Sequence, residues 1–165
     1  MDTTTARYLE YMVHSFFDGL TVLRKLEGIS DEEMETVYAL GYNFFIYGKY
    51  EAARDLFTDL SAYAPYTSHY WRALGAVNQQ LKNYTKAIAA YDMAITNDEN
   101  DVVSYVYRAE SQILSGNLDA GLQDLAMVVI LGAGQPEYSA WKERATLLLE
   151  IHKKDWKLLF DNLKD

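Results

Sequence analysis

A short turn motif recurs along this chain at a fixed step of 34 residues. The residues Gly-Lys-Tyr at 48–50 are followed by Ala53 and Phe57. The same spacing returns twice, first as Lys82, Asn83 and Tyr84 with Ala87 and Tyr91, and then as Gly116, Asn117 and Leu118 with Gly121 and Leu125. A period of this length means that the chain stacks copies of one supersecondary unit, which restricts its fold more than any other feature.

Each unit reads as two helices joined by a polar turn. Small residues stand where the two helices must approach closely, and we expect Gly41 to face Ala53, Gly75 to face Ala87 and Ala109 to face Gly121. The predicted apolar anchors are Leu40 and Phe57 in the first unit, Trp71, Leu74 and Tyr91 in the second, and Tyr105 and Leu125 in the third. The third unit is the weakest match, because Arg108 replaces the leucine of the first two.

The 34-residue step is the signature of the tetratricopeptide repeat. We therefore predict an all-α fold and a single domain over residues 1–165, with three helix-turn-helix repeats at 34–67, 68–101 and 102–135. One helical pair cannot bury its apolar stripe alone, so stacked repeats share a continuous core and curve into a superhelix with a concave face.

Helical segments are predicted on both sides of the repeats. In residues 1–33, apolar residues recur at spacings of three and four, and the segment is expected either to cap the first repeat or to act as a self-association arm. The candidate dimerisation residues are Tyr8, Met12, Phe16, Leu20 and Leu23. Ser30 and Glu33 form a capping box that starts the next helix. Residues 136–165 are predicted to cap the other end with one stripe, Tyr138, Trp141, Ala145, Leu148, Trp156, Leu159 and Leu163.

Candidate binding residues lie on the first helix of each repeat. Tyr38, Tyr42 and Phe45 share one side of a helix, which the repeat register turns towards the concave groove. The corresponding residues are Arg72, Ala76 and Gln79 in the second repeat, with Gln80 beside them, and Val106, Glu110 and Ile113 in the third. Such a face suits an extended peptide with a few apolar anchors. The alternative is that some of these residues belong to the core between repeats.

The composition argues against several functional classes. A formal net charge of −9 leaves no basic stripe for the phosphates of a nucleic acid. No apolar run reaches the roughly 20 residues that span a bilayer, and no export signal is recognised at the N-terminus. The chain has no cysteine, and its three histidines fall on different predicted helices. We therefore expect no metal site, no cofactor and no enzymatic activity.

Several runs of sequence resemble the class II chaperones of bacterial type III secretion systems. They are residues 17–23 (Phe-Asp-Gly-Leu-Thr-Val-Leu), 28–33, 37–42, 47–53 and 70–76, together with the Asn-Tyr turn at 83–84. The resemblance covers roughly residues 16 to 130. It departs from the family at Gly19-Leu20, where two consecutive glycines are common, and this departure affects the expected path of the first helices.

The resemblance implies a chaperone of the bacterial cytoplasm. Such proteins keep hydrophobic translocator proteins soluble before export, and many self-associate through the N-terminal region. They bind a short translocator segment in the concave groove, which here implies Tyr38, Tyr42, Phe45, Arg72, Ala76 and Gln79. The expected partners are therefore a translocator and a second copy of the chain.

Two other functions remain open from the sequence. A tetratricopeptide adaptor that clamps a C-terminal carboxylate would need Lys and Asn in the groove of the first repeat, where Tyr38 and Tyr42 stand. A structural or regulatory subunit of the secretion apparatus would instead hold a folded or helical partner, through the convex face or the C-terminal helix.

Overall fold

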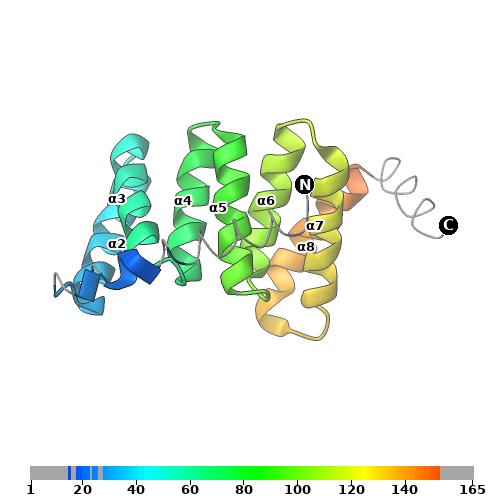
Figure 1. The fold of residues 1–165 in the computed structure, drawn as a ribbon. Coiled ribbons are helices and arrows are strands. Elements are labelled where there is room, and N and C mark those ends of the chain that lie inside the picture. The colour runs from blue at the N-terminus through cyan, green and yellow to red at the C-terminus, as the bar shows by residue number, and fades with distance from the viewer. Residues whose placement is uncertain (1–14, 16–17, 23, 26–27, 153–165) are drawn as a thin grey trace, which may run out of the picture.

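The computed structural model describes residue 15 and residues 18–22, 24–25 and 28–152. These residues contain helices and no strand, and the helices form three antiparallel pairs followed by a further helix (Figure 1). The pairs are α2 (Asp31–Ile46) with α3 (Tyr50–Tyr63), α4 (Ser68–Gln80) with α5 (Tyr84–Asn97), and α6 (Val102–Leu114) with α7 (Leu118–Leu131). A short 3-10 helix, η1 (Pro136–Tyr138), leads into α8 (Ser139–Ile151). The predicted all-α repeat fold is confirmed.

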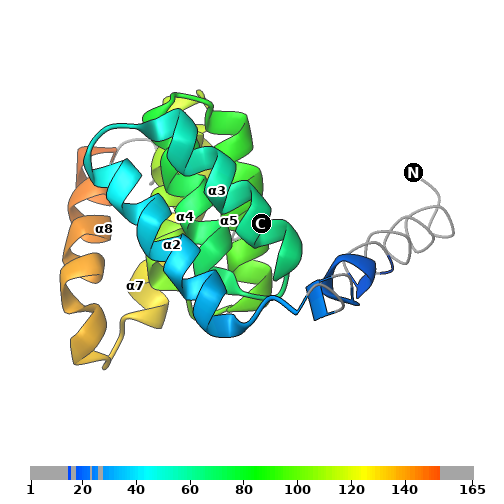
Figure 2. The ribbon, with the colours of Figure 1, turned by 90° about the vertical axis from the view of Figure 1, so that its left-hand side faces the viewer.

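The repeats stack in chain order. Each helix packs against the next one along the chain, and α4 also contacts α2 and α6, so the first helices of the three repeats are neighbours. Figure 2 views the array from its first repeat, with α2 and α3 in front and the later helices behind them. This order brings one face of α2, α4 and α6 to the same side of the molecule.

The start of α2 has the predicted capping box. The Glu33 amide donates to Ser30 Oγ at 3.1 Å, and the Ser30 amide donates to a Glu33 carboxylate oxygen at 2.8 Å. The backbone hydrogen bond from Ser30 lowers the pKa of Glu33. Both residues are exposed, so the capping box serves to begin the helix and forms no part of a pocket.

The turns inside the repeats share one backbone conformation. Gly48, Lys82 and Gly116 are 34 residues apart, and all have positive φ, of 73°, 59° and 91°. Glycine adopts this left-handed region freely, whereas a residue with a Cβ atom is disfavoured there. The second repeat therefore keeps the turn geometry of the others at some energetic cost.

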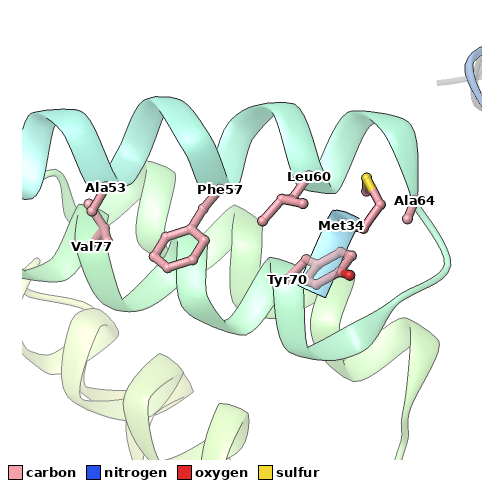
Figure 3. Close-up of a cluster of buried hydrophobic side chains, with 7 residues drawn as sticks. All are labelled: Met34, Ala53, Phe57, Leu60, Ala64, Tyr70 and Val77. Atoms are coloured by element: carbon pink, nitrogen blue, oxygen red, sulfur yellow. The ribbon is translucent and has the colours of Figure 1, made fainter. Parts of the chain in front are cut away.

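Glycines on α2 and α4 make room for aromatic rings. A Cβ atom on Gly41 would lie 2.8 Å from the ring of Phe57, and one on Gly75 would lie 2.5 Å from the ring of Tyr91. The predicted partners Ala53 and Ala87 are thus wrong, because the bulky residue one turn further along the second helix fills the space. Figure 3 shows Phe57 among the buried side chains that join the first and second repeats.

The third repeat reverses this arrangement. Here the glycine is on the second helix, and a Cβ atom on Gly121 would lie 2.9 Å from the backbone oxygen of Ala109 and 2.6 Å from Ile113. The predicted approach of Ala109 to Gly121 is therefore confirmed. Leu125 is fully buried at the position occupied by the aromatic rings of the earlier repeats.

Ion pairs replace apolar contacts around Arg108. Its guanidinium donates from Nε and Nη2 to the two carboxylate oxygens of Asp124, at 2.7 and 2.6 Å, and from Nη1 to Asp92 at 2.6 Å. Burial opposes the charge on Arg108, but the hydrogen bonds to Asp124 outweigh it and raise the pKa of the guanidinium. The arginine that weakened the sequence match is thus accommodated by two carboxylates from α5 and α7.

Leu40 was predicted as a core anchor, and this is wrong. Its side chain is 46% exposed. The equivalent Leu74 packs into the cluster that contains residues of the first repeat, whereas Leu40 has no preceding repeat against which to pack.

The C-terminal helix covers the last repeat as predicted. Ala145 is buried, and Tyr138, Trp141 and Leu148 pack on the same cluster as the core of α6 and α7. Trp156, Leu159 and Leu163 lie outside the described residues, as do the dimerisation candidates Tyr8, Met12, Phe16 and Leu23. Leu20 is described and is partly buried.

Candidate functional site: a groove across the first helices

A groove of about 480 Å³ runs across α2, α4 and α6 and reaches α8. It is lined by residues from the first helix of every repeat, with contributions from α3 and α8. The lining residues are Tyr38, Tyr42, Phe45, Phe57, Arg72, Ala73, Ala76, Gln79, Gln80, Val103, Tyr107, Glu110 and Arg144. Because the walls belong to packed helices, the groove is a preformed surface.

The α2 side of the groove is aromatic. Tyr38 is half-buried, with its ring centroid 5.6 Å from that of Phe57 and 5.1 Å from that of His69. Burial raises the pKa of the Tyr38 hydroxyl, which therefore stays protonated and able to donate. Tyr42 is 51% exposed, and Phe45 packs edge-on against Tyr50 at 5.6 Å. This end offers apolar surface that water still reaches.

The centre of the groove combines small side chains with an anchored arginine. Ala73 and Ala76 leave space above α4. Arg72 donates from Nη1 to Asp101 at 2.9 Å. Asp101 is buried and also accepts from the amide and hydroxyl of Ser104, at 3.2 and 2.6 Å, at the start of α6. The cap of α6 thus fixes the direction of Arg72.

The α6 side of the groove is polar and continues into α8. Tyr91 donates to the Gln79 amide oxygen at 2.9 Å, and the Gln79 amide nitrogen lies 3.4 Å from Glu110. Arg144 of α8 donates to Glu110 from Nε at 2.9 Å and also from Nη2, and its guanidinium stands over the ring of Tyr107 at 5.5 Å. The capping helix therefore supplies one wall of the groove.

The structure places the predicted binding residues at this groove with one exception. Tyr38, Tyr42, Phe45, Arg72, Ala76, Gln79, Gln80 and Glu110 all line it, and their part in binding stays a prediction. Val106 was wrong, because it is fully buried in the core cluster of the third repeat. The equivalent Tyr38 and Arg72 have long side chains that extend from this border position into the groove, and valine does not. Ile113 was also wrong as a groove residue, since it packs towards Gly121.

The sequence interpretation missed Phe57, Ala73, Val103, Tyr107 and Arg144. A signal existed for α6, because Val103, Tyr107 and Glu110 follow each other at spacings of four and three, as do Tyr38, Tyr42 and Phe45. Arg144 had no such signal. It lies outside the repeats, so the 34-residue register says nothing of its direction.

Among the described residues, no helix combines the length and apolar character needed to cross a bilayer. The same part of the chain gathers no group of three or more His, Cys, Asp or Glu side chains that could hold a metal ion. The groove is therefore described by its shape, its aromatic surface and its hydrogen-bonding groups.

Sequence comparison finds both the repeat and relatives of similar length. The tetratricopeptide-repeat family model matches residues 34–66 and 68–101. The low calcium response locus protein H of Yersinia pseudotuberculosis is 28% identical over 152 residues, which cover 92% of this chain and 90% of that protein.

Solved structures agree with the fold described above. PcrH, a protein of Pseudomonas aeruginosa, is 30% identical in its complex with the chaperone binding region of PopD, with a TM-score of 0.75; the match covers 78% of this chain and 96% of PcrH. The Yersinia enterocolitica type III secretion chaperone SycD, in complex with a peptide of the translocator YopD, is 29% identical, with a TM-score of 0.73. That match covers 77% of this chain and 97% of SycD.

Proposed function

The chain belongs to the translocator chaperones of type III secretion systems, and we propose that its groove binds an apolar segment of a translocator protein and keeps that protein soluble until export. The observation that carries the proposal is the continuous groove over α2, α4 and α6, aromatic at one end and hollowed by alanines at its centre. Since the family consists of chaperones, the chain is not an enzyme.

The groove has the dimensions of a short extended peptide. Three helices about 10 Å apart span roughly 20 to 30 Å. An extended chain at about 3.3 Å per residue fills that span with about 6 to 9 residues. Three buried aliphatic side chains would contribute about 1.5 to 3 kcal/mol each, against an association cost of at least about 4 kcal/mol. The segment alone should bind weakly, so a full client would need further contact surface.

The proposal gives each part of the groove a role. Tyr42 and Phe45 contact apolar side chains of the client, and Ala76 leaves room for one of them. Arg72, Gln79, Gln80 and Glu110 offer hydrogen bonds to its backbone. Tyr38 belongs to both the groove and the core, because its ring also packs on Phe57.

The proposal extends to the chain as a whole. Residues 1–165 form one domain that works in the bacterial cytoplasm, where a chaperone must meet its client before export. Residues 1–33 serve as the arm of a homodimer, and the repeats at 34–135 provide the groove.

The test is co-expression of the chain with a hydrophobic translocator from the same secretion system, followed by co-purification. Tyr42→Ala is the informative variant, because Tyr42 lines the groove and is half exposed, so its loss should leave the fold intact. Tyr47→Ala is the matched control, since Tyr47 is 78% exposed and does not line the groove. Helical circular dichroism checks that both variants are folded.

We expect the native chain and the Tyr47 variant to yield a soluble complex, and the Tyr42 variant to lose most of it. Equal recovery with both variants would move the binding surface away from the groove, as expected for a subunit that holds a folded partner. Failure of the native chain to solubilise any translocator would contradict the proposed function.

A further inference from the structure

The α8 end of the groove contains an arginine with unused donor capacity. Arg144 gives its Nε and Nη2 to Glu110, and its Nη1 makes no hydrogen bond to any described residue. The side chain is 45% exposed, so a molecule in the groove can reach it. Arg72 is similar, since Nη1 contacts Asp101 and its other nitrogens have no partner in the described part of the chain.

Arg108 shows what a complete site of this kind looks like in the same protein. Its Nε and Nη2 bind one carboxylate, Asp124, and its Nη1 binds a second, Asp92. Arg144 has the first of these interactions, with Glu110, and lacks the second. The arrangement leaves room for one more carboxylate on the free edge of the guanidinium.

The carboxylates at the groove are already engaged, which argues against a basic group at this position. Glu110 is the only acidic residue that lines the groove among the described residues, and it is held by Arg144 and Gln79. Asp101 behind it is buried and held by Arg72 and Ser104. A lysine or arginine from a client would meet two guanidinium groups and no free carboxylate.

We propose that Arg144 selects client segments with an acidic side chain at the α8 end of the groove, and that it does so as a specificity-determining residue. The inference rests on the proposed function, because it assumes that a peptide occupies the groove. The acidic side chain accepts from Arg144 Nη1, while the apolar anchors of the same segment lie over Tyr42 and Phe45. The groove thus reads the direction of the segment, apolar residues at α2 and a carboxylate at α8.

Glu110 keeps this preference moderate. It already occupies one edge of the Arg144 guanidinium and repels a second negative charge nearby, as Asp124 and Asp92 do around Arg108. A charge-assisted hydrogen bond in a groove that the client covers should change the affinity by about 5- to 20-fold.

The experiment is selection from a displayed library of random peptides with the folded full-length chain. Four proteins are compared, namely the wild type, Tyr42→Ala, Arg144→Gln and Arg54→Gln. Arg54 is the matched control, because it also pairs with a carboxylate, Asp55, but lies on α3 outside the groove. Peptides that the wild type enriches and the Tyr42 variant does not are taken as groove binders. Their affinities are then measured with each Asp or Glu replaced by its amide.

We expect the groove binders of the wild type and of Arg54→Gln to contain an Asp or Glu at a constant distance from their apolar residues. The amide replacement should weaken binding to these two proteins by about 5- to 20-fold, and binding to Arg144→Gln by less than about 2-fold. Arg144→Lys should restore part of the preference.

Groove binders without an acidic preference, or an acidic preference that survives in Arg144→Gln, would overturn this inference and leave the proposed function standing. If no peptide depends on Tyr42, the groove does not bind peptides. That result would overturn the proposed function together with the inference.

Discussion

In the first two repeats a glycine on the first helix lies under an aromatic ring from the second helix, whereas in the third repeat the glycine has moved to the second helix. Gly41 and Gly75 receive Phe57 and Tyr91, while Gly121 approaches Ala109. The third repeat also replaces an apolar residue with Arg108. Close packing therefore constrains the sum of the facing side chains, and either helix can provide the small one.

This difference has a consequence for the groove. The first two repeats turn Tyr38 and Arg72 towards it from positions 34 residues apart, and the third turns Tyr107 and Glu110 instead. A groove built from unequal repeats has two distinct ends, and a bound segment has a preferred direction. The four predictions below break or sharpen this contrast.

The largest effect is expected at the ion pair of the third repeat. Asp124→Ala leaves Arg108 mostly buried, with only the exposed Asp92 as a partner, and should lower the free energy of unfolding by about 2 to 4 kcal/mol. Combining Arg108→Leu with Asp124→Ala gives the third repeat the residues that the second has at 74 and 90. The double variant should return to within about 1 kcal/mol of the wild type or exceed it. Urea unfolding measures both, and a double variant weaker than Asp124→Ala would contradict the equivalence of the repeats.

Gly75→Ala tests the close approach in the second repeat. The new Cβ atom would lie 2.5 Å from the ring of Tyr91, so the ring must shift. We expect a loss of about 1 to 3 kcal/mol, although alanine favours a helix by about 1 kcal/mol over glycine. Thermal unfolding followed by circular dichroism measures the loss, with Gly19→Ala as the control, because a Cβ atom there meets nothing within 4 Å. A variant as stable as the wild type would mean that the glycine does not set the spacing of α4 and α5.

Lys82→Gly tests the one non-glycine residue in the repeated turn. Lys82 has φ of 59°, in the region that glycine occupies at 48 and 116. Glycine should relieve a backbone strain of about 1 to 2 kcal/mol, less the larger entropy that it gives to the unfolded chain. The net gain should be about 0.5 to 1 kcal/mol in urea unfolding. A loss of stability would show that the lysine side chain makes up for its strained backbone.

The smallest effect concerns pH and the start of the first repeat. The pKa of Glu33 is lowered in the folded chain from its value of 4.5 by its hydrogen bonds to Ser30. Its contribution to stability is therefore fully present above about pH 4.5 and is lost as the pH falls through the folded-state pKa. Glu33→Gln should be less stable than the wild type at neutral pH, and the difference should shrink in acid. A difference that stays constant with pH would exclude the carboxylate as its source.

The 34-residue period was sufficient to predict the helical pairs, their order and most of the groove. It failed where side-chain length or chain ends decide the outcome. Val106 and Arg72 have the same register, yet valine stays in the core and arginine reaches the groove. Leu40 has the same register as Leu74, but no preceding repeat covers it. Arg144 was missed because a period carries no information on residues outside the repeats.

The contact between α8 and the groove also bears on when the protein becomes competent. Translation delivers the helices in order, and α8 follows the last of the repeats. Until Arg144 has emerged, Glu110 lacks its partner and the groove lacks one wall. A nascent chain is therefore an incomplete chaperone, and synthesis of its cap is the step that finishes the binding surface.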